Sequence, residues 1–168
     1  MKDESVSKII NTLHIKTELG NLKWNVIKEY PSENNTLSSY ITNNASFSKS
    51  VGIKSISNKN KYYQLQISQS YYCEFSSGII YLFYYYVKEF LSDFNQELKE
   101  AIIASSNRRE LPPKFNINLI LAIQPDLNSQ ISELNVIEEN QEDLRRLYVI
   151  ATRNTNKNFD FINNLINN

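Results

Sequence analysis

The sequence has few of the residues on which most cofactor and metal sites depend. Its three glycines lie far apart, at positions 20, 52 and 78, so no glycine-rich loop can surround a phosphate. Its single histidine, His14, and its single cysteine, Cys73, exclude zinc fingers, iron–sulfur clusters and internal disulfides. We therefore expect no cofactor, no metal site and no assembled catalytic residues, and the sequence favours a non-enzymatic role.

Charge of one sign is also missing, because 18 basic residues balance 18 acidic ones. No overall field then draws the chain toward nucleic acid or an anionic membrane. The longest apolar stretch, residues 79–87, is too short for the roughly 20 residues of a membrane span. The first five residues carry acids where a signal peptide has a basic region. We expect a cytoplasmic protein that does not enter a membrane.

The 168 residues have the size of one domain, and their patterning predicts a single α+β domain over residues 1–168. Apolar residues recur at helical spacing over 4–19, and Gly20 follows at the position of a C-terminal cap. Residues 22–26 then alternate between apolar and polar, which predicts a strand with Trp24 as a core anchor. From 31 to 59 serine and asparagine dominate, and we expect a surface loop or a short-helix insertion.

The clearest pattern lies between residues 62 and 84, where apolar and polar residues alternate in three runs. We interpret the runs as three antiparallel strands in a meander, with a tight turn at Ser77-Gly78. This turn would place Phe75 opposite Ile80, and Cys73 would face the core as a small hydrophobic residue.

The second half of the chain also has segments of helical and of strand patterning. Apolar spacing predicts a helix over 88–105, a strand over 115–123 and a returning strand over 131–136. C-terminal helices are expected over 138–168, with acidic residues in the first turn. The sum is a five- or six-stranded, mostly antiparallel sheet with helices packed on one face.

Several core-type segments give the chain a resemblance. They are Gly-Asn-Leu-Lys-Trp at 20–24, Ile-Ile-Tyr-Leu-Phe at 79–83, Leu-Ala-Ile-Gln-Pro at 121–125 and Leu-Arg-Arg-Leu-Tyr at 144–148. In this order the chain resembles a loose group of small uncharacterised bacterial and phage proteins, often carried on mobile elements. The resemblance implies a cytoplasmic accessory role, such as phage–host conflict or regulation, and it carries no known site residues.

Tyrosine is the residue in surplus, with eight of eleven between positions 62 and 86. Alternation places Tyr72, Tyr81, Phe83 and Tyr85 together on the second face of the sheet, which we call the aromatic face. Either the predicted 88–105 helix or the last helix covers this face, or the face is exposed and offers a large contact area to a partner. The sequence leaves both possibilities open.

The resulting hypothesis is a non-enzymatic interaction or regulatory module that binds a protein partner or a second copy of itself through the aromatic face. One alternative is a nucleic-acid-binding accessory protein that stacks bases on the same tyrosines and places Arg108 and Arg109, with Lys59 and Lys61, on phosphates. A second alternative is a metal-dependent nuclease or hydrolase that uses Asp126 and Glu133. Asp126 also fits an ordinary turn, which explains it without chemistry.

Overall fold

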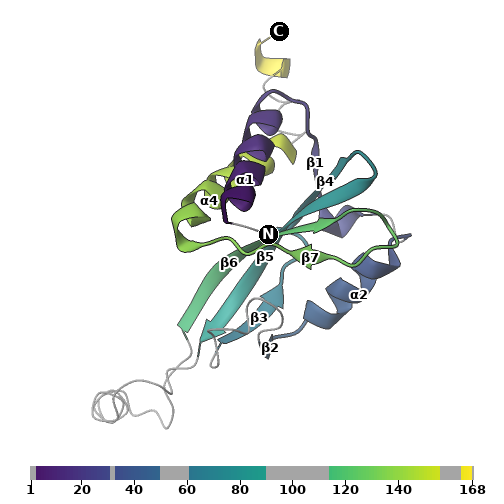
Figure 1. Cartoon of the computed structure of the whole chain (residues 1–168), viewed down its shortest axis with the longest axis vertical. Coiled ribbons are helices and arrows are strands. Elements are labelled where there is room, and N and C mark those ends of the chain that lie inside the picture. Colours follow the sequence, from purple (N-terminus) through teal and green to yellow (C-terminus); the bar gives the residue numbers. More distant parts are fainter. Residues whose placement is uncertain (1–2, 31–32, 50–60, 90–113, 156–163, 168) are drawn as a thin grey trace.

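The computed structural model describes residues 3–30, 33–49, 61–89, 114–155 and 164–167. Its elements are α1 (Asp3–Glu18), β1 (Trp24–Val26), the 3-10 turn η1 (Ile27–Glu29), α2 (Asn35–Asn44), β2 (Ser48–Lys49), β3 (Lys61–Leu65), β4 (Tyr71–Phe75), β5 (Gly78–Glu89), β6 (Lys114–Gln124), β7 (Ser132–Glu133), the 3-10 turn η4 (Glu138–Asn140) and α4 (Gln141–Thr155) (Figure 1). Residues 164–167 are also helical. The α+β class and the mostly antiparallel sheet predicted from the sequence are confirmed.

The sheet is built around the long strand β5. Within the described residues it has seven strands, and all its pairings are antiparallel. One edge of β5 pairs with β4 along its first half and with β3 along its second half. The other edge pairs with β6 over eleven residues. The short strands β1, β2 and β7 extend the sheet outward from β4, β3 and β6. A long β5–β6 ribbon therefore forms the spine of the molecule.

The predicted meander is wrong in one pairing, because β3 pairs with β5 rather than with β4. This arrangement is possible because β5 continues through Lys88 and Glu89, where the sequence had suggested the start of a helix. Three consecutive tyrosines and a valine, residues 84–87, favour a strand in this part of β5. The remainder of the predicted 88–105 helix lies outside the described residues.

The register of the β4–β5 hairpin also differs from the prediction, by two residues. Phe75 lies opposite Gly78, and Cys73 lies opposite Ile80. The turn consists of Ser76 and Ser77, and Ser76 takes a left-handed conformation with φ 56°. Gly78 is the first residue of β5, and a larger residue does not fit there because its Cβ atom would lie 2.8 Å from the backbone oxygen of Gln124. A shift of two residues keeps each side chain on its predicted face.

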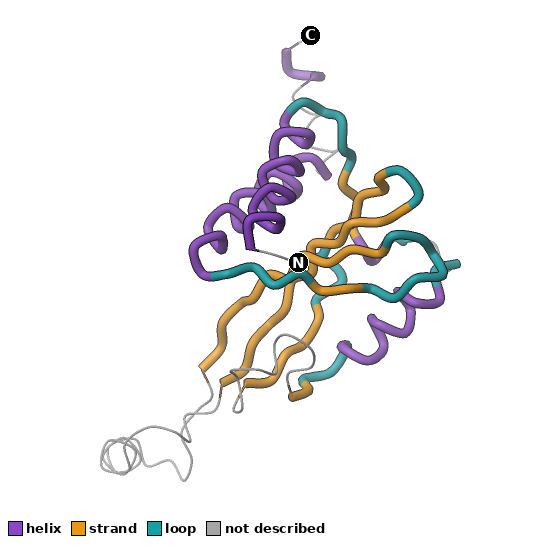
Figure 2. Tube along the Cα trace, viewed as in Figure 1, coloured by secondary structure: helices purple, strands orange, loops and turns teal. Residues whose placement is uncertain are grey.

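Helices lie on both faces of the sheet. The sequence predicted helices on one face, and α1 and α4 pack side by side there, whereas α2 lies on the other face (Figure 2). Helix α1 is followed by a Schellman cap at Gly20 (φ 76°), in which the Asn21 amide donates to the Lys16 carbonyl. None of the helices in the described ranges is long and apolar enough to cross a lipid bilayer.

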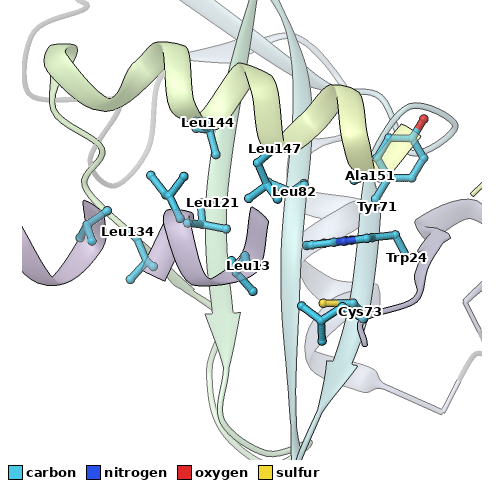
Figure 3. Packing of buried hydrophobic residues seen from close by; sticks show 13 residues of the cluster. Leu13, Trp24, Tyr71, Cys73, Leu82, Leu121, Leu134, Leu144, Leu147 and Ala151 are labelled. Carbon is cyan, nitrogen blue, oxygen red and sulfur yellow. The ribbon is translucent and has the colours of Figure 1, made fainter. Parts of the chain in front are cut away.

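The core under α1 and α4 contains Trp24, as predicted. Trp24 is completely buried, and its indole N–H donates to the Thr17 hydroxyl at 2.9 Å. Cys73 points into the same cluster (Figure 3). Helix α4 contributes Leu144, Leu147 and Ala151, which are fully buried, so the predicted helix after residue 138 is confirmed together with its apolar side.

The segment predicted as a loop or short-helix insertion contains helix α2. Asn34 caps its first turn by accepting a hydrogen bond from the Leu37 amide at 3.0 Å. Leu37 is buried against the sheet. The insertion thus supplies the layer that covers the aromatic face. Of the predicted terminal helix, Phe161 and Ile162 lie outside the described residues, and Leu165 and Ile166 are exposed.

Candidate functional site

The aromatic face is buried by the chain itself. Tyr72 is 8% exposed, and Tyr81, Phe83 and Tyr85 are 0% exposed. Tyr40 of α2 stacks on Phe83, with ring centroids 4.5 Å apart. Tyr30 packs edge-on against Tyr72, with ring centroids 4.6 Å apart. The burial answers the question that the sequence left open and corrects the proposed docking surface, because a partner cannot reach these four side chains while α2 and Tyr30 cover them.

Two chains of hydrogen bonds tie α2 to the aromatic face. In the first, Asn34 Nδ2 donates to the Tyr81 hydroxyl at 3.1 Å, and Tyr81 donates to Gln124 Oε1 at 2.6 Å. In the second, the Tyr40 hydroxyl bonds to Tyr85 and donates to Glu133 Oε1 at 2.8 Å. Burial raises the pKa of Tyr40, Tyr81 and Tyr85 above the ordinary value for tyrosine. The phenols are therefore neutral structural groups near neutral pH.

Of the four basic residues proposed to contact nucleic acid, the structure describes one, Lys61. Arg108, Arg109 and Lys59 lie outside the described residues. Lys61 begins β3 and pairs with Glu89 across the ladder. Base stacking on the aromatic face would require the same buried rings, so the geometry gives no support to that use of the sheet.

The two acidic residues considered for metal-dependent chemistry have other partners. Asp126 accepts from the Asn128 amide and the Ser129 hydroxyl, each at 2.8 Å, and these bonds lower its pKa. This is the turn role that its sequence context suggested. Glu133 accepts from Tyr40 under α2. The described part of the chain holds no group of three or more His, Cys, Asp or Glu side chains that could hold a metal ion.

The histidine and the cysteine lie in structural positions. His14 Nε2 is 3.2 Å from Glu18 Oε1, one turn further along α1. Cys73 is completely buried, and desolvation raises the pKa of its thiol to about 12. Thiolate chemistry at neutral pH is therefore suppressed at Cys73.

The far end of the β5–β6 ribbon has an exposed apolar surface. In Figure 2 these strand ends extend beyond the pair of helices α1 and α4. Phe115 is 63% exposed, Ile117 is 52% exposed and Tyr86, opposite Ile117, is 37% exposed. All three lie on the sheet face that α1 and α4 cover further along the ribbon, because they alternate in step with Leu121. We call these three residues the ribbon patch.

The outer edge of β6 is open beside the ribbon patch. Strand β7 pairs only with Ala122 and Ile123, and the Leu134 amide donates to the Leu121 carbonyl. Along residues 114–120, the outer edge has no strand partner among the described residues. The Ile117 amide points to this outer side, where it donates to the side-chain oxygen of Asn116 at 3.0 Å. An open edge with exposed apolar side chains is a site for strand pairing.

An apolar groove lies on the same face of the sheet, at the other end of the ribbon. It has a volume of about 470 Å³ and runs between α1, the β4–β5 turn and the end of β6. Its volume falls in the range of ligand sites in proteins. The open β6 edge and this groove are two candidate binding surfaces in the described structure.

Comparison of the chain with protein-family models, with curated proteins and with solved structures gave no match. A functional assignment must therefore come from the geometry of these two surfaces.

Proposed function

We propose that the protein is a non-enzymatic interaction module that binds a second copy of itself by pairing the open edges of two β6 strands. The observation that carries the proposal is the open edge at residues 114–120 beside Phe115 and Ile117, which are more than half exposed. Pairing would continue the sheet across two molecules and satisfy the outward-facing backbone groups of both edges.

A symmetric register is available for this pairing. Ile117 and Leu121 both direct backbone groups to the outer side of β6, so the odd-numbered residues 115, 117 and 119 face a second strand. A two-fold axis at Ile117 places Phe115 opposite the second copy's Leu119 and joins the two ribbon patches side by side. Such an interface uses the same residues on both molecules, as a closed dimer requires.

The charges along the edge are compatible with this register. Lys114 is the only charged residue from 114 to 120, and it would lie opposite Ile120 rather than opposite another lysine. One local contact competes with the pairing, because the Ile117 amide already donates to the side-chain oxygen of Asn116. Dimer formation exchanges this local hydrogen bond for one between the strands.

Replacement of Ile117 by proline tests the proposal directly. Ile117→Pro removes an outward amide that β5 does not use, and proline is tolerated at such positions of edge strands. We expect the natural chain to be a dimer at micromolar concentration in multi-angle light scattering. The Ile117→Pro variant should be a monomer with an unchanged far-ultraviolet circular dichroism spectrum.

Ile117→Thr serves as the matched control, because threonine keeps the amide and the β-branched shape. This variant should still dimerise, with weaker affinity from the lost apolar contact. A natural chain that stays monomeric at its highest soluble concentration would contradict the proposal. A folded Ile117→Pro variant that dimerises as strongly as the natural chain would contradict it equally.

The accessory role in phage–host conflict or regulation, which the resemblance implies, stays part of this proposal. A strand edge that can pair with a second copy can also be capped by a host or phage protein, which would link dimerisation to regulation. Pull-down from host lysate with the natural chain and with Ile117→Pro tests this step. A partner captured equally by both would contradict a role for the edge.

A further inference from the structure

The apolar groove beside α1 is lined mainly by hydrocarbon side chains. Ile9 and Leu13 of α1 form one wall, and Ile80 and Ile123 of the sheet form the floor. Phe75 lies at the mouth and is 50% exposed, although it is a large apolar side chain. Covering such a surface with an apolar ligand removes apolar area from water and lowers the free energy.

The floor of the groove is fixed by close backbone packing. Gly78 lies so near the end of β6 that a Cβ atom would be 2.8 Å from the Gln124 oxygen and 2.9 Å from the Pro125 oxygen. The Ser77 hydroxyl donates to the Pro125 carbonyl at 3.4 Å. The turn and the end of β6 thus hold each other in place, and the groove is formed before any ligand arrives.

The charged side chains that line the groove are all positive. Lys8 and Lys16 of α1 line it together with Thr12, at intervals of four residues along one side of the helix. No aspartate or glutamate is among its described lining residues. Neither lysine forms an ion pair with the described residues, and Lys16 Nζ lies 5.7 Å from the centre of the Phe75 ring. The groove therefore suits a ligand that joins an apolar body to a negative group.

We propose that this groove binds a monomeric fatty-acid-like carboxylate, with its alkyl chain on Ile9, Leu13 and Ile123 and its head at Lys8 or Lys16. Eight residues of helix separate the two lysines by about 12 Å, so a compact head group reaches only one of them. A single negative charge matches a single ammonium group. This inference is independent of the β6 edge, which lies elsewhere on the molecule.

Calorimetric titration with decanoate, kept below the concentration at which it forms micelles, tests the inference. We expect saturable binding with one site per chain. Dissociation constants should fall about fourfold for each methylene added from octanoate to decanoate, because each buried methylene contributes a fixed free energy. Decanol should bind more weakly, and decyltrimethylammonium more weakly still, since the rim is positive.

Single charge substitutions identify the head-group lysine. Either Lys8→Gln or Lys16→Gln should weaken decanoate binding by up to about fivefold and leave decanol binding unchanged. Lys23→Gln is the matched control, because Lys23 is exposed and does not line the groove. Thr12→Trp, at an exposed position on the groove wall, should block binding without unfolding the chain.

Several results would overturn the inference. One is the absence of saturable heat with decanoate, and another is binding of decanol as tight as that of decanoate. A third is a Thr12→Trp variant that binds decanoate like the natural chain while keeping its circular dichroism spectrum. Binding to anionic vesicles without binding to monomeric decanoate would assign the groove to a membrane surface instead. The Ile117→Pro variant should bind decanoate normally, which separates this test from that of the dimer.

Discussion

Asn34 joins three parts of the molecule through one side chain. Its oxygen caps α2 at the Leu37 amide, and its nitrogen donates to Tyr81 of β5 and, at 2.9 Å, to Gln124 of β6. Gln124 is itself completely buried and donates to the Ser129 carbonyl at 3.0 Å. Because unpaired buried amides are costly, these contacts favour one position of α2 on the sheet.

Cys73 gives a prediction at the same scale. Its thiol has a pKa of about 12 in the folded chain, against an ordinary value of 9.0. At pH 8 the thiolate fraction is then about a thousandfold smaller than in the unfolded chain. An aromatic disulfide reagent should react with the native protein at least about a thousandfold more slowly than with the urea-unfolded chain. Equal rates in the two states would show that Cys73 is accessible.

Single residues differ in how far the sequence predicts them. Alternation alone places Trp24 and Cys73 inward, because a strand with one apolar side has only one way to face the core. Asn34 cannot be found in this way, since it is one of many polar residues in the 31–59 segment. Its role depends on residues 47 and 90 positions away in the chain.

At the scale of elements, β5 is held on one edge by two separate strands. Between β4 and β3 the ladder is interrupted, and Ser70 fills the gap. Its hydroxyl accepts from the Tyr84 amide at 2.9 Å and donates to the Gln66 carbonyl at 2.8 Å. Ser70 is 0% exposed, so no water can replace it from outside.

Replacement of Ser70 by alanine removes only one hydroxyl group, but it should lower the stability of the protein measurably. Ser70→Ala leaves the Tyr84 amide and the Gln66 carbonyl without this partner, and we expect the free energy of unfolding to fall by about 1–3 kcal/mol. Urea denaturation measures the loss. Thr152→Ala is the control, because it removes an exposed hydroxyl bond on α4 and should change stability by less than about 0.5 kcal/mol. Equal losses in the two variants would contradict the role of Ser70.

Elements are predictable from the sequence where local pattern decides them. Helix α1, the β4–β5 hairpin, β6 and α4 follow from periodicity and turn residues. The partner of β3 does not, because pairing with β4 or with β5 satisfies the same alternation. The hairpin register does not follow from alternation either, because Phe75 opposite Gly78 and Phe75 opposite Ile80 leave every side chain on the same face.

At the scale of the whole molecule, one sheet separates two apolar clusters. The cluster under α1 and α4 contains Trp24 and most of the buried leucines, and the cluster under α2 contains most of the buried tyrosines. The same strands supply both clusters, so we expect them to unfold together. The tyrosine-rich cluster makes this stability sensitive to alkaline pH.

The sign of that sensitivity follows from the raised tyrosine pKa values. Burial raises the pKa of Tyr81 and Tyr85 in the folded state, while in the unfolded chain they ionise near pH 10. Their contribution is constant below pH 10, and stability falls above it by about 1.4 kcal/mol per pH unit for each such tyrosine. Urea midpoints should be similar at pH 8 and pH 9 and much lower at pH 11.

A substitution isolates this effect. The Tyr81→Phe variant has no phenol to ionise, so its stability should fall less steeply above pH 10 than that of the natural chain. Its absolute stability at pH 8 should be lower, because the hydrogen bonds to Asn34 and Gln124 are lost. An identical slope for both proteins would contradict the assignment to Tyr81.

The surfaces that can engage other molecules were the least predictable feature. The sequence drew attention to tyrosine, but the tyrosines of the aromatic face are internal. The groove joins α1 to residues 123–125, and the open edge depends on β7 ending after two residues. Both are products of long-range packing, and no short segment carries their signal.

Because β4 and β3 hold different halves of one edge of β5, a local opening at one end of this edge need not break the pairs at the other end. Amide hydrogens in the first half of β5 should then exchange with solvent at rates different from those in the second half. Such local openings are distinct from the global transition, in which the two clusters unfold together.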